Sequence, residues 1–244
     1  NKYMYFVANW KMYGNLSSLN ALDKVINFSK SKEIKKGRLI YCPPYTLLSS
    51  FSKKFINCQI AIGGQNSHES YSYGAYTGSV NSRMLKNIGA HFVIIGHSEN
   101  REKGENDKLI NLKIKSALEA KLKVIFCIGE TLREKRKKKT QSVLSKQIKI
   151  GLDGVKNMSN IFIAYEPVWA IGTGITPKPK DLLITVKFIK SKFKEKKPKV
   201  LYGGSVNPQN INDLKEINNI DGFLIGGASQ NVNKFIDIVK KTYS

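Results

Sequence analysis

The sequence predicts an α/β fold, a single (β/α)8 barrel that spans residues 1–244. Short apolar runs recur about every 30 residues, the length of one strand–helix unit. Apolar and polar residues do not alternate within a run, which is typical of parallel strands covered on both faces. A doubly wound nucleotide-binding sheet usually carries a glycine-rich turn after its first strand, and none follows the first run here. These observations favour one closed barrel with no internal linker.

Each apolar run is a predicted strand, and amphipathic segments separate the runs. Strands that alternate with helices form parallel sheets. One intervening segment carries a stripe at helical spacing, made of Leu109, Leu112, Lys113 and Leu118. The predicted strands are residues 5–8, 39–42, 60–62, 92–95, 124–127, 161–164, 200–202 and 222–225.

The charge balance is strongly positive, with 41 Lys and Arg against 18 Asp and Glu and a formal net charge of +23. Such a surface attracts anions, so a barrel that binds polyanions without catalysis is one alternative. The lysines are spread along the chain, however, and the densest run, residues 133–139, is not interleaved with aromatic residues. Nucleic acid is therefore not expected as a partner. No apolar run reaches the roughly 20 residues that cross a membrane, so no membrane partner is expected either.

The cysteines Cys42, Cys58 and Cys127 lie far apart and form no C-x-x-C pair. Cys42 and Cys127 end apolar runs, which favours free and mostly buried thiols. This pattern predicts a reducing, cytoplasmic location and gives no sign of a metal site. Residues 1–4 lead directly into the first apolar run, so no signal peptide is expected.

Polar residues after the strands are the candidate functional residues, because the loops that follow the strands of a (β/α)8 barrel share one rim. Asn9 and Lys11 follow the first run, His97 the fourth and Glu166 the sixth. Lys11 alone is most simply a surface lysine, and a lone histidine is more often structural than functional. Glu166 interrupts a long apolar segment, where an unpaired carboxylate is costly. Apolar surroundings favour the protonated form of a carboxylate, which suits a general base working near neutral pH.

Two glycine pairs, Gly203-Gly204 and Gly226-Gly227, follow the last two runs. Tight turns alone would explain them. Their place after the seventh and eighth strands also matches the phosphate site common in such barrels, where backbone N–H groups face an anion. The convergence of a base, an imidazole, a cation and these turns on one rim predicts an active site with a phosphate-binding end.

Several segments resemble the triosephosphate isomerase family, in the family's order and spacing and over essentially the whole chain. The resemblance implies a TIM barrel that interconverts dihydroxyacetone phosphate and D-glyceraldehyde 3-phosphate, a step of glycolysis and gluconeogenesis. It also implies that no metal or organic cofactor takes part. The matching segments are NWK at 9–11, GHSE at 96–99, CIGE at 127–130, AYEPVWAIGTG at 164–174, YGGSV at 202–206 and GGAS at 226–229.

The resemblance implies roles for five residues in the proton-transfer mechanism of this family. Glu166 is expected to remove the proton next to the substrate carbonyl, giving an enediolate. His97, in its neutral form, is expected to donate a hydrogen bond to the substrate oxygens, and Lys11 to stabilise the developing negative charge. Asn9 is expected to orient the substrate and Lys11, and Glu99 to hold neighbouring side chains.

The substrate phosphate is expected at Gly172, Ser205, Gly226 and Gly227. Gly172 belongs to a loop that resembles the family's mobile lid, with residues 167–169 as its leading hinge, and closure of such a lid excludes water. The trailing residues 175–177 differ from the usual family pattern, which bears on loop kinetics and not on reaction type. Other phosphate-binding barrels, of the indole or ribulose-phosphate type, are a second alternative, but they lack both the lid motif and the first-strand motif.

The loop around Thr77 resembles the arm that, in this family, inserts into a second subunit beside its Lys11. The resemblance therefore implies a homodimer. Without a partner, the tyrosines of this loop would be exposed to water, which favours the same conclusion. These tyrosines are Tyr71, Tyr73 and Tyr76.

Two positions depart from the family at this expected interface. Ser79 and Asn100 stand where the family usually has Glu and Arg, which are expected to face each other across the dimer. Because both charges are lost together, neither is left unpaired. We expect the dimer to persist without this pair.

Overall fold

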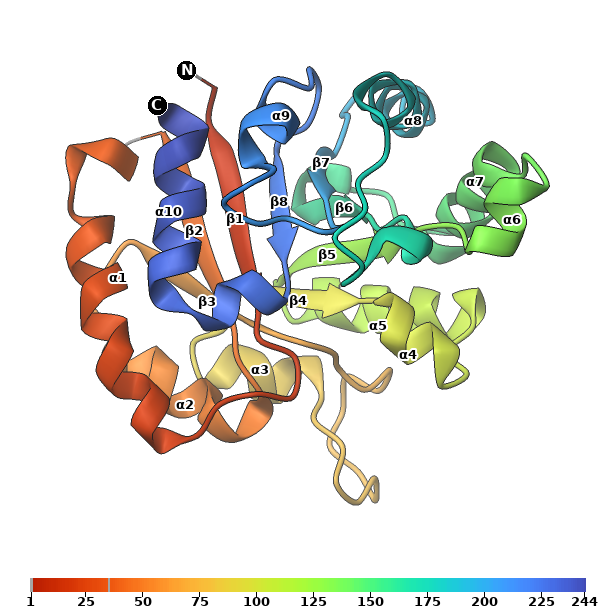
Figure 1. Cartoon of the computed structure of the whole chain (residues 1–244). Helices are drawn as coiled ribbons and strands as arrows, with labels where there is room; N and C mark the ends of the chain where they lie inside the picture. The colour runs from red at the N-terminus through yellow and green to blue at the C-terminus, as the bar shows by residue number, and fades with distance from the viewer. Residues whose placement is uncertain (1, 35) are drawn as a thin grey trace.

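The computed structural model describes residues 2–34 and 36–244 and confirms the predicted barrel. All strands run parallel and pair in chain order, and β8 pairs with β1, so the sheet has no free edge (Figure 1). Every predicted strand is present. Their bounds are Met4–Asn9 (β1), Gly37–Cys42 (β2), Ile60–Gly64 (β3), Phe92–Ile95 (β4), Lys123–Ile128 (β5), Ile161–Tyr165 (β6), Lys199–Tyr202 (β7) and Gly222–Ile225 (β8).

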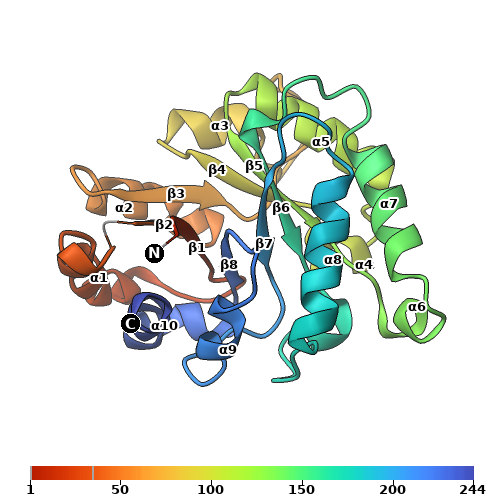
Figure 2. The same ribbon diagram turned by 90° about the horizontal axis from the view of Figure 1, so that it is seen from above.

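Helices surround the ring of strands, as Figure 2 shows from above. Short 3-10 turns stand beside the rim at Val168–Ala170 and Gly227–Gln230, with others at Leu16–Ala21, Lys32–Ile34 and Met158–Asn160. The α-helices are Leu22–Ser29 (α1), Tyr45–Lys54 (α2), Ser82–Asn87 (α3), Ser98–Glu102 (α4), Asp107–Glu119 (α5), Leu132–Arg136 (α6), Thr140–Gly151 (α7), Pro179–Ser191 (α8), Ile211–Lys215 (α9) and Val232–Tyr243 (α10).

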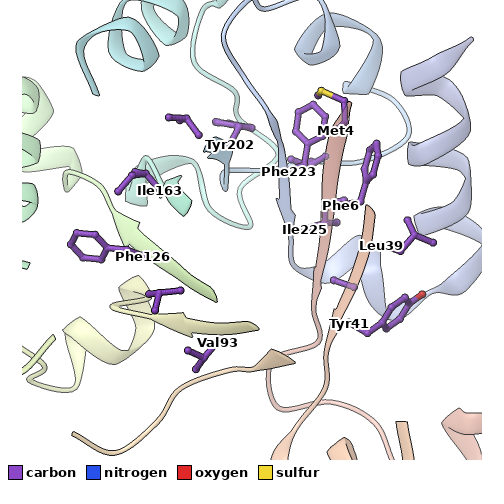
Figure 3. Packing of buried hydrophobic residues seen from close by; sticks show 14 of the residues in the cluster. Met4, Phe6, Leu39, Tyr41, Val93, Phe126, Ile163, Tyr202, Phe223 and Ile225 are labelled. Atoms are coloured by element: carbon purple, nitrogen blue, oxygen red, sulfur yellow. The ribbon is translucent and has the colours of Figure 1, made fainter. Parts of the chain in front are cut away.

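The strands are apolar on both faces because each face belongs to a different core. Val7 and Leu224 point into the barrel, where the interior side chains form one buried cluster. Their neighbours Phe6 and Phe223 point outward and join a larger cluster between the strands and the helices (Figure 3). Both faces of each strand are therefore removed from water, which explains the unbroken apolar runs.

The predicted stripe on α5 is wrong in part. Leu112 is 52% exposed, whereas Ile110 and Ile114 are fully buried against the barrel. Lys113 is buried because its ammonium group pairs with Glu105 at the start of the same helix–loop segment. The buried face is formed by Ile110, Ile114 and Ala117, which also stand at helical spacing, so the stripe was assigned to the wrong side of the helix at Leu112.

The segment between β3 and α3 projects away from the barrel (Figure 1). Tyr73 and Tyr76 are exposed there, as expected, and each packs locally: Arg83 lies over the Tyr73 ring, and Tyr76 stacks on His68. Tyr71 differs from the expectation, because it is half-buried and packs against the core.

No helix in the part of the chain that the structure describes is long and apolar enough to cross a membrane. The predicted domain of residues 1–244 includes residues 1 and 35, which lie outside the described residues.

Candidate active site

A cavity of 320 Å³ opens at the carboxyl ends of the strands. Of the catalytic and substrate-binding residues expected from the sequence, only Glu99 is absent from its lining, and Glu99 reaches the cavity indirectly through Lys11. The single rim therefore collects the groups that the strand-end argument expects there. The lining includes Asn9, Lys11, His97, Glu166, Gly172, Ser205, Gly226 and Gly227.

Lys11 adopts a backbone conformation that its side chain does not favour, with φ at 54°. Two hydrogen bonds hold it there: its N–H donates to Asn9 Oδ1 at 3.1 Å, and its carbonyl accepts from Gln65 Nε2 at 2.8 Å. Such conformations cost of order 1 kcal/mol or more and persist where the surroundings impose them. Asn9 thus orients Lys11, and the turn aims the lysine side chain into the cavity.

Glu99 holds the Lys11 ammonium group, with Nζ 2.7 Å from a Glu99 carboxylate oxygen. Partial burial on its own raises the pKa of Glu99, but the bond from Lys11 and the nearby His97 and Lys103 outweigh it. The net result is a lowered pKa, so Glu99 stays ionised near neutral pH. An ionised Glu99 fixes the position of the cation.

Glu166 and His97 meet inside the rim, and both side chains are almost fully buried. One Glu166 carboxylate oxygen lies 2.9 Å from His97 Nε2, and the other accepts the Ser98 backbone N–H at 3.3 Å. His97 Nδ1 accepts the Glu99 backbone N–H at 3.2 Å. Because Nδ1 accepts a hydrogen bond, the single proton of a neutral ring resides on Nε2 and points at the carboxylate.

Several groups act in opposite directions on the charge of His97. Burial lowers the pKa of the imidazole, but the carboxylates of Glu166 and Glu99 outweigh burial, and the net pKa is raised. The N–H of Glu99 at Nδ1 opposes this, because a doubly protonated ring would lose that bond. The part of the raised pKa that Glu166 contributes depends on its contact with His97.

Gly129, after β5, fixes the place of Glu166. A Cβ atom at Gly129 would lie 1.7 Å from the Glu166 carbonyl oxygen, closer than any two such atoms can approach. The Glu166 N–H in turn donates to the Ile128 carbonyl at 2.8 Å. Only glycine lets the two loops approach this closely, and this approach sets the base in the rim.

The far end of the cavity is lined by backbone amides. Several N–H groups there donate to no protein acceptor within the described part of the chain. Unpaired backbone amides at the edge of a cavity are suited to bind an anion such as phosphate. These amides belong to Gly172, Ser205, Gly226 and Gly227.

The loop that follows Glu166 covers this end of the cavity and is tied to Ser205. The Ser205 hydroxyl accepts the Gly174 N–H at 3.1 Å and donates to the Ala170 carbonyl at 2.7 Å. On the other side, Trp169 Nε1 donates to a carboxylate oxygen of the buried Glu130 at 3.0 Å. The loop is thus held at both of its ends.

The chain matches known proteins of one family along nearly its whole length. The triosephosphate isomerase family model matches residues 4–242. The chain belongs to the triosephosphate isomerase family. The triosephosphate isomerase of Thermodesulfovibrio yellowstonii is 42% identical over 245 residues, covering 97% of this chain and 98% of that protein. That of Dictyoglomus thermophilum is 43% identical over 244 residues, covering 96% and 97%. The crystal structure of the Bartonella henselae triosephosphate isomerase superposes with a TM-score of 0.89 at 36% identity, covering 98% of each chain.

Two residues near the site of this triosephosphate isomerase family member escape the sequence argument. Gln65 is the first residue after β3 and bridges the carbonyls of Lys11 and Cys42, so the strand-end argument, applied to the third strand, would have found it. Lys234 lines the phosphate end from the first turn of α10. Among the described residues, no carboxylate lies within 4.0 Å of its ammonium group. The only sequence feature that indicates Lys234 is its place in the first turn of the helix after the last strand.

The cysteines of this family member are all free, and Cys42 and Cys127 are buried. Burial raises the pKa of the Cys127 thiol well above its ordinary value, with the nearby Glu166 adding to the effect. Within residues 2–34 and 36–244, no group of three or more His, Cys, Asp or Glu side chains could hold a metal ion.

Proposed function

We propose that the chain interconverts dihydroxyacetone phosphate and D-glyceraldehyde 3-phosphate by proton transfer through an enediolate. The observation that carries the proposal is one cavity with a carboxylate and an imidazole, 2.9 Å apart, at one end and unpaired amides at the other. A three-carbon phosphate has matching ends: a phosphate for the amides and a carbonyl with an adjacent C–H bond for the acid–base pair. Family membership supports the same isomerase reaction.

Glu166 acts as the base. Its carboxylate takes a proton from C1 of dihydroxyacetone phosphate, and the electron pair of that C–H bond forms the C1–C2 double bond as negative charge moves to the carbonyl oxygen. The same carboxyl group then returns a proton to C2, while the oxygen on C2 gains the proton that the oxygen on C1 loses, and the C1 oxygen becomes the new carbonyl. The product is D-glyceraldehyde 3-phosphate, and no electron acceptor is required.

His97 and Lys11 stabilise the negative charge. The Nε2–H of neutral His97 donates to the substrate oxygens and moves protons between them, in place of its bond to Glu166. Lys11 places an ammonium group beside the same oxygens. Asn9 orients Lys11 through its backbone, and Glu99 holds the ammonium group in place.

Gly172, Ser205, Gly226 and Gly227 bind the phosphate through their backbone N–H groups. The loop that carries Gly172 closes over the bound substrate and excludes water, which strengthens each electrostatic interaction and protects the enediolate. The catalytic unit is the whole barrel, residues 1–244, and needs no metal or organic cofactor.

The reaction in D2O tests this mechanism. A base that exchanges its proton with solvent gives glyceraldehyde 3-phosphate with deuterium at C2, which mass spectrometry detects. Direct hydride movement between C1 and C2 would retain the original hydrogen and would contradict the proposed mechanism. Absence of turnover in folded protein would contradict the proposed activity itself.

A homodimer joined through the loop around Thr77 is part of the proposal. Apolar side chains on the first, second and third loops support it, because such a surface is costly in water. Met12, at 94% exposure, lies one residue after Lys11, so a partner that covers it would also approach the site. The exposed apolar residues in these loops and at the helices beside them are Met12, Tyr13, Leu16, Tyr45, Tyr73, Tyr76 and Met84.

Analytical ultracentrifugation tests the dimer. We expect a dimer at micromolar concentration, although Ser79 and Asn100 replace the charged pair usual in the family. Tyr73→Asp should shift the protein towards monomer, whereas Ile184→Asp, at another exposed apolar residue that lies on α8, should not. A wild-type monomer at this concentration would contradict the proposal. A cytoplasmic location is proposed from the free and mostly buried cysteines.

A further inference from the structure

The dense basic run at residues 133–139 touches the loop that covers the active site. Lys135, in α6, places its ammonium nitrogen 3.1 Å from the centroid of the Trp169 ring. Trp169 belongs to the turn Val168–Ala170, directly after Glu166 and Pro167. One lysine of this run therefore reaches the leading end of the loop from outside the active-site cavity.

The Trp169 ring has two contacts that restrain different motions. Its Nε1–H donates to Glu130 Oε1 at 3.0 Å, which fixes one point in the plane of the ring. A single hydrogen bond leaves the ring free to tilt about that point. The cation on the ring face restrains this tilt, because the attraction depends on the cation lying over the face. Glu130 and Lys135 together fix both the position and the plane of the indole.

α6 holds Lys135 in place for this contact. The Thr131 hydroxyl accepts the Glu134 N–H, and the Glu134 carboxylate accepts the Thr131 N–H. These two hydrogen bonds form a capping box at the start of the helix. The Lys135 N–H donates to the Thr131 carbonyl at 2.9 Å. A capped helix of this kind presents the lysine from a defined direction.

The contacts of Lys135 favour a role in positioning the loop over a role in general solubility. Lys135, Trp169 and Pro177 line a second cavity of 310 Å³, so the lysine lies beside both the leading and the trailing residues of the loop. Partial burial lowers the pKa of Lys135, and the carboxylates of Glu130 and Asp181 oppose this effect. Both carboxylates also attract the ammonium group to this side of the loop.

We propose that Lys135 is a positioning residue for the active-site loop, acting through the face of the Trp169 ring. The inference rests on the proposed function, since the loop is taken to close over a bound substrate. Lys135 does not touch the substrate. It limits how far the leading end of the loop departs from its place beside Glu166, and so favours the closed arrangement in which Ser205 binds Gly174.

Three variants test the role. Lys135→Gln removes the charge and keeps most of the side-chain length, Lys135→Arg retains a cation, and Lys137→Gln removes a neighbouring charge of the same run. Acrylamide quenching of tryptophan fluorescence reports the loop directly. Trp10, the other tryptophan, is only 3% exposed, so changes in quenching report Trp169. Isomerase kinetics are measured on the same samples.

We expect Lys135→Gln to increase the quenching constant and to lower kcat/KM two- to five-fold, the factor that corresponds to about 0.5–1 kcal/mol for a partly exposed cation–π contact. Lys135→Arg should restore both values, and Lys137→Gln should match the wild type. Equal quenching in Lys135→Gln and Lys137→Gln would overturn the proposal, as would unchanged kinetics despite increased quenching or a failure of Lys135→Arg to restore them. The quenching measurement stands even if the wild type has no isomerase activity, so failure of the proposed function is recognised separately.

Discussion

His97 Nε2 lies 2.9 Å from a carboxylate oxygen of Glu166, and both groups are shielded from water. The pair links the protonation of the imidazole to the charge of the base. Near this carboxylate the pKa of His97 is raised, although burial alone lowers it. The balance of these two effects can be measured in the free protein.

Glu166→Gln should lower the pKa of His97. The substitution removes the carboxylate that raises the pKa and leaves burial, which lowers it, in place. NMR titration of the imidazole should therefore give a lower His97 pKa in the variant than in the wild type, with His91 as the internal control. An equal or higher pKa in the variant would show that Glu166 does not control the imidazole charge.

Gly129→Ala should reduce kcat by about 100-fold, the usual effect of moving a catalytic group by about 1 Å. The new Cβ atom would lie 1.7 Å from the Glu166 carbonyl oxygen, so the loop that carries the base has to move. Steady-state kinetics measure the loss, and circular dichroism verifies that the barrel still forms. Wild-type kcat in a folded variant would mean that the base tolerates displacement of its backbone.

Lys234→Gln should lower kcat/KM roughly two- to five-fold at low salt, and less at about 0.5 M salt, because screening weakens attraction between a lysine and an anionic substrate. Lys234 lines the phosphate end of the cavity, whereas Lys240, on the same helix, lies near the opposite end and pairs with Glu33. Lys240→Gln is therefore the matched control. Equal kinetics for the two variants at low salt would contradict a role for Lys234 in phosphate attraction.

Asp221→Asn should destabilise the barrel at pH 7 by about 2–3 kcal/mol. Burial raises the pKa of Asp221, but Lys190, the Val200 N–H and Lys2 outweigh burial and the net pKa is lowered. A carboxylate with a lowered folded-state pKa stabilises the fold above its unfolded pKa, and this stability is lost as pH falls through the folded value. Urea unfolding should therefore show a difference that shrinks in acid, with the exposed Asp153→Asn as control. A difference independent of pH would point to packing in place of charge.

The barrel was predictable because its signal is local. Val7 and Phe6 face different cores, and both must be apolar, so the first strand is recognisable without any partner. The residues of the rim were predictable for a related reason. A polar residue that directly follows a strand, such as Glu166, lies at the carboxyl ends of the strands in this fold.

The features that could not be predicted from the sequence depend on contacts between distant segments. The partner of Glu99 is Lys11, 88 residues away, and nothing near either residue indicates the pair. The prediction for α5 was wrong at Leu112, because Ile110 and Ile114 form the buried face. The burial of Lys113 depends on Glu105 and on Asn66, and Asn66 comes from another loop. Spacing within one segment cannot reveal a polar partner that another segment supplies.

The identity of the base is tested most directly by comparing two glutamate variants. Turnover of glyceraldehyde 3-phosphate is measured for the wild type, for Glu166→Gln and for Glu119→Gln, whose side chain is exposed at the end of α5. We expect rapid turnover in the wild type and in Glu119→Gln, and a loss of roughly 100- to 10,000-fold in Glu166→Gln, the range for removal of a general base. Retention of wild-type turnover by folded Glu166→Gln would contradict the assignment of Glu166 as the base.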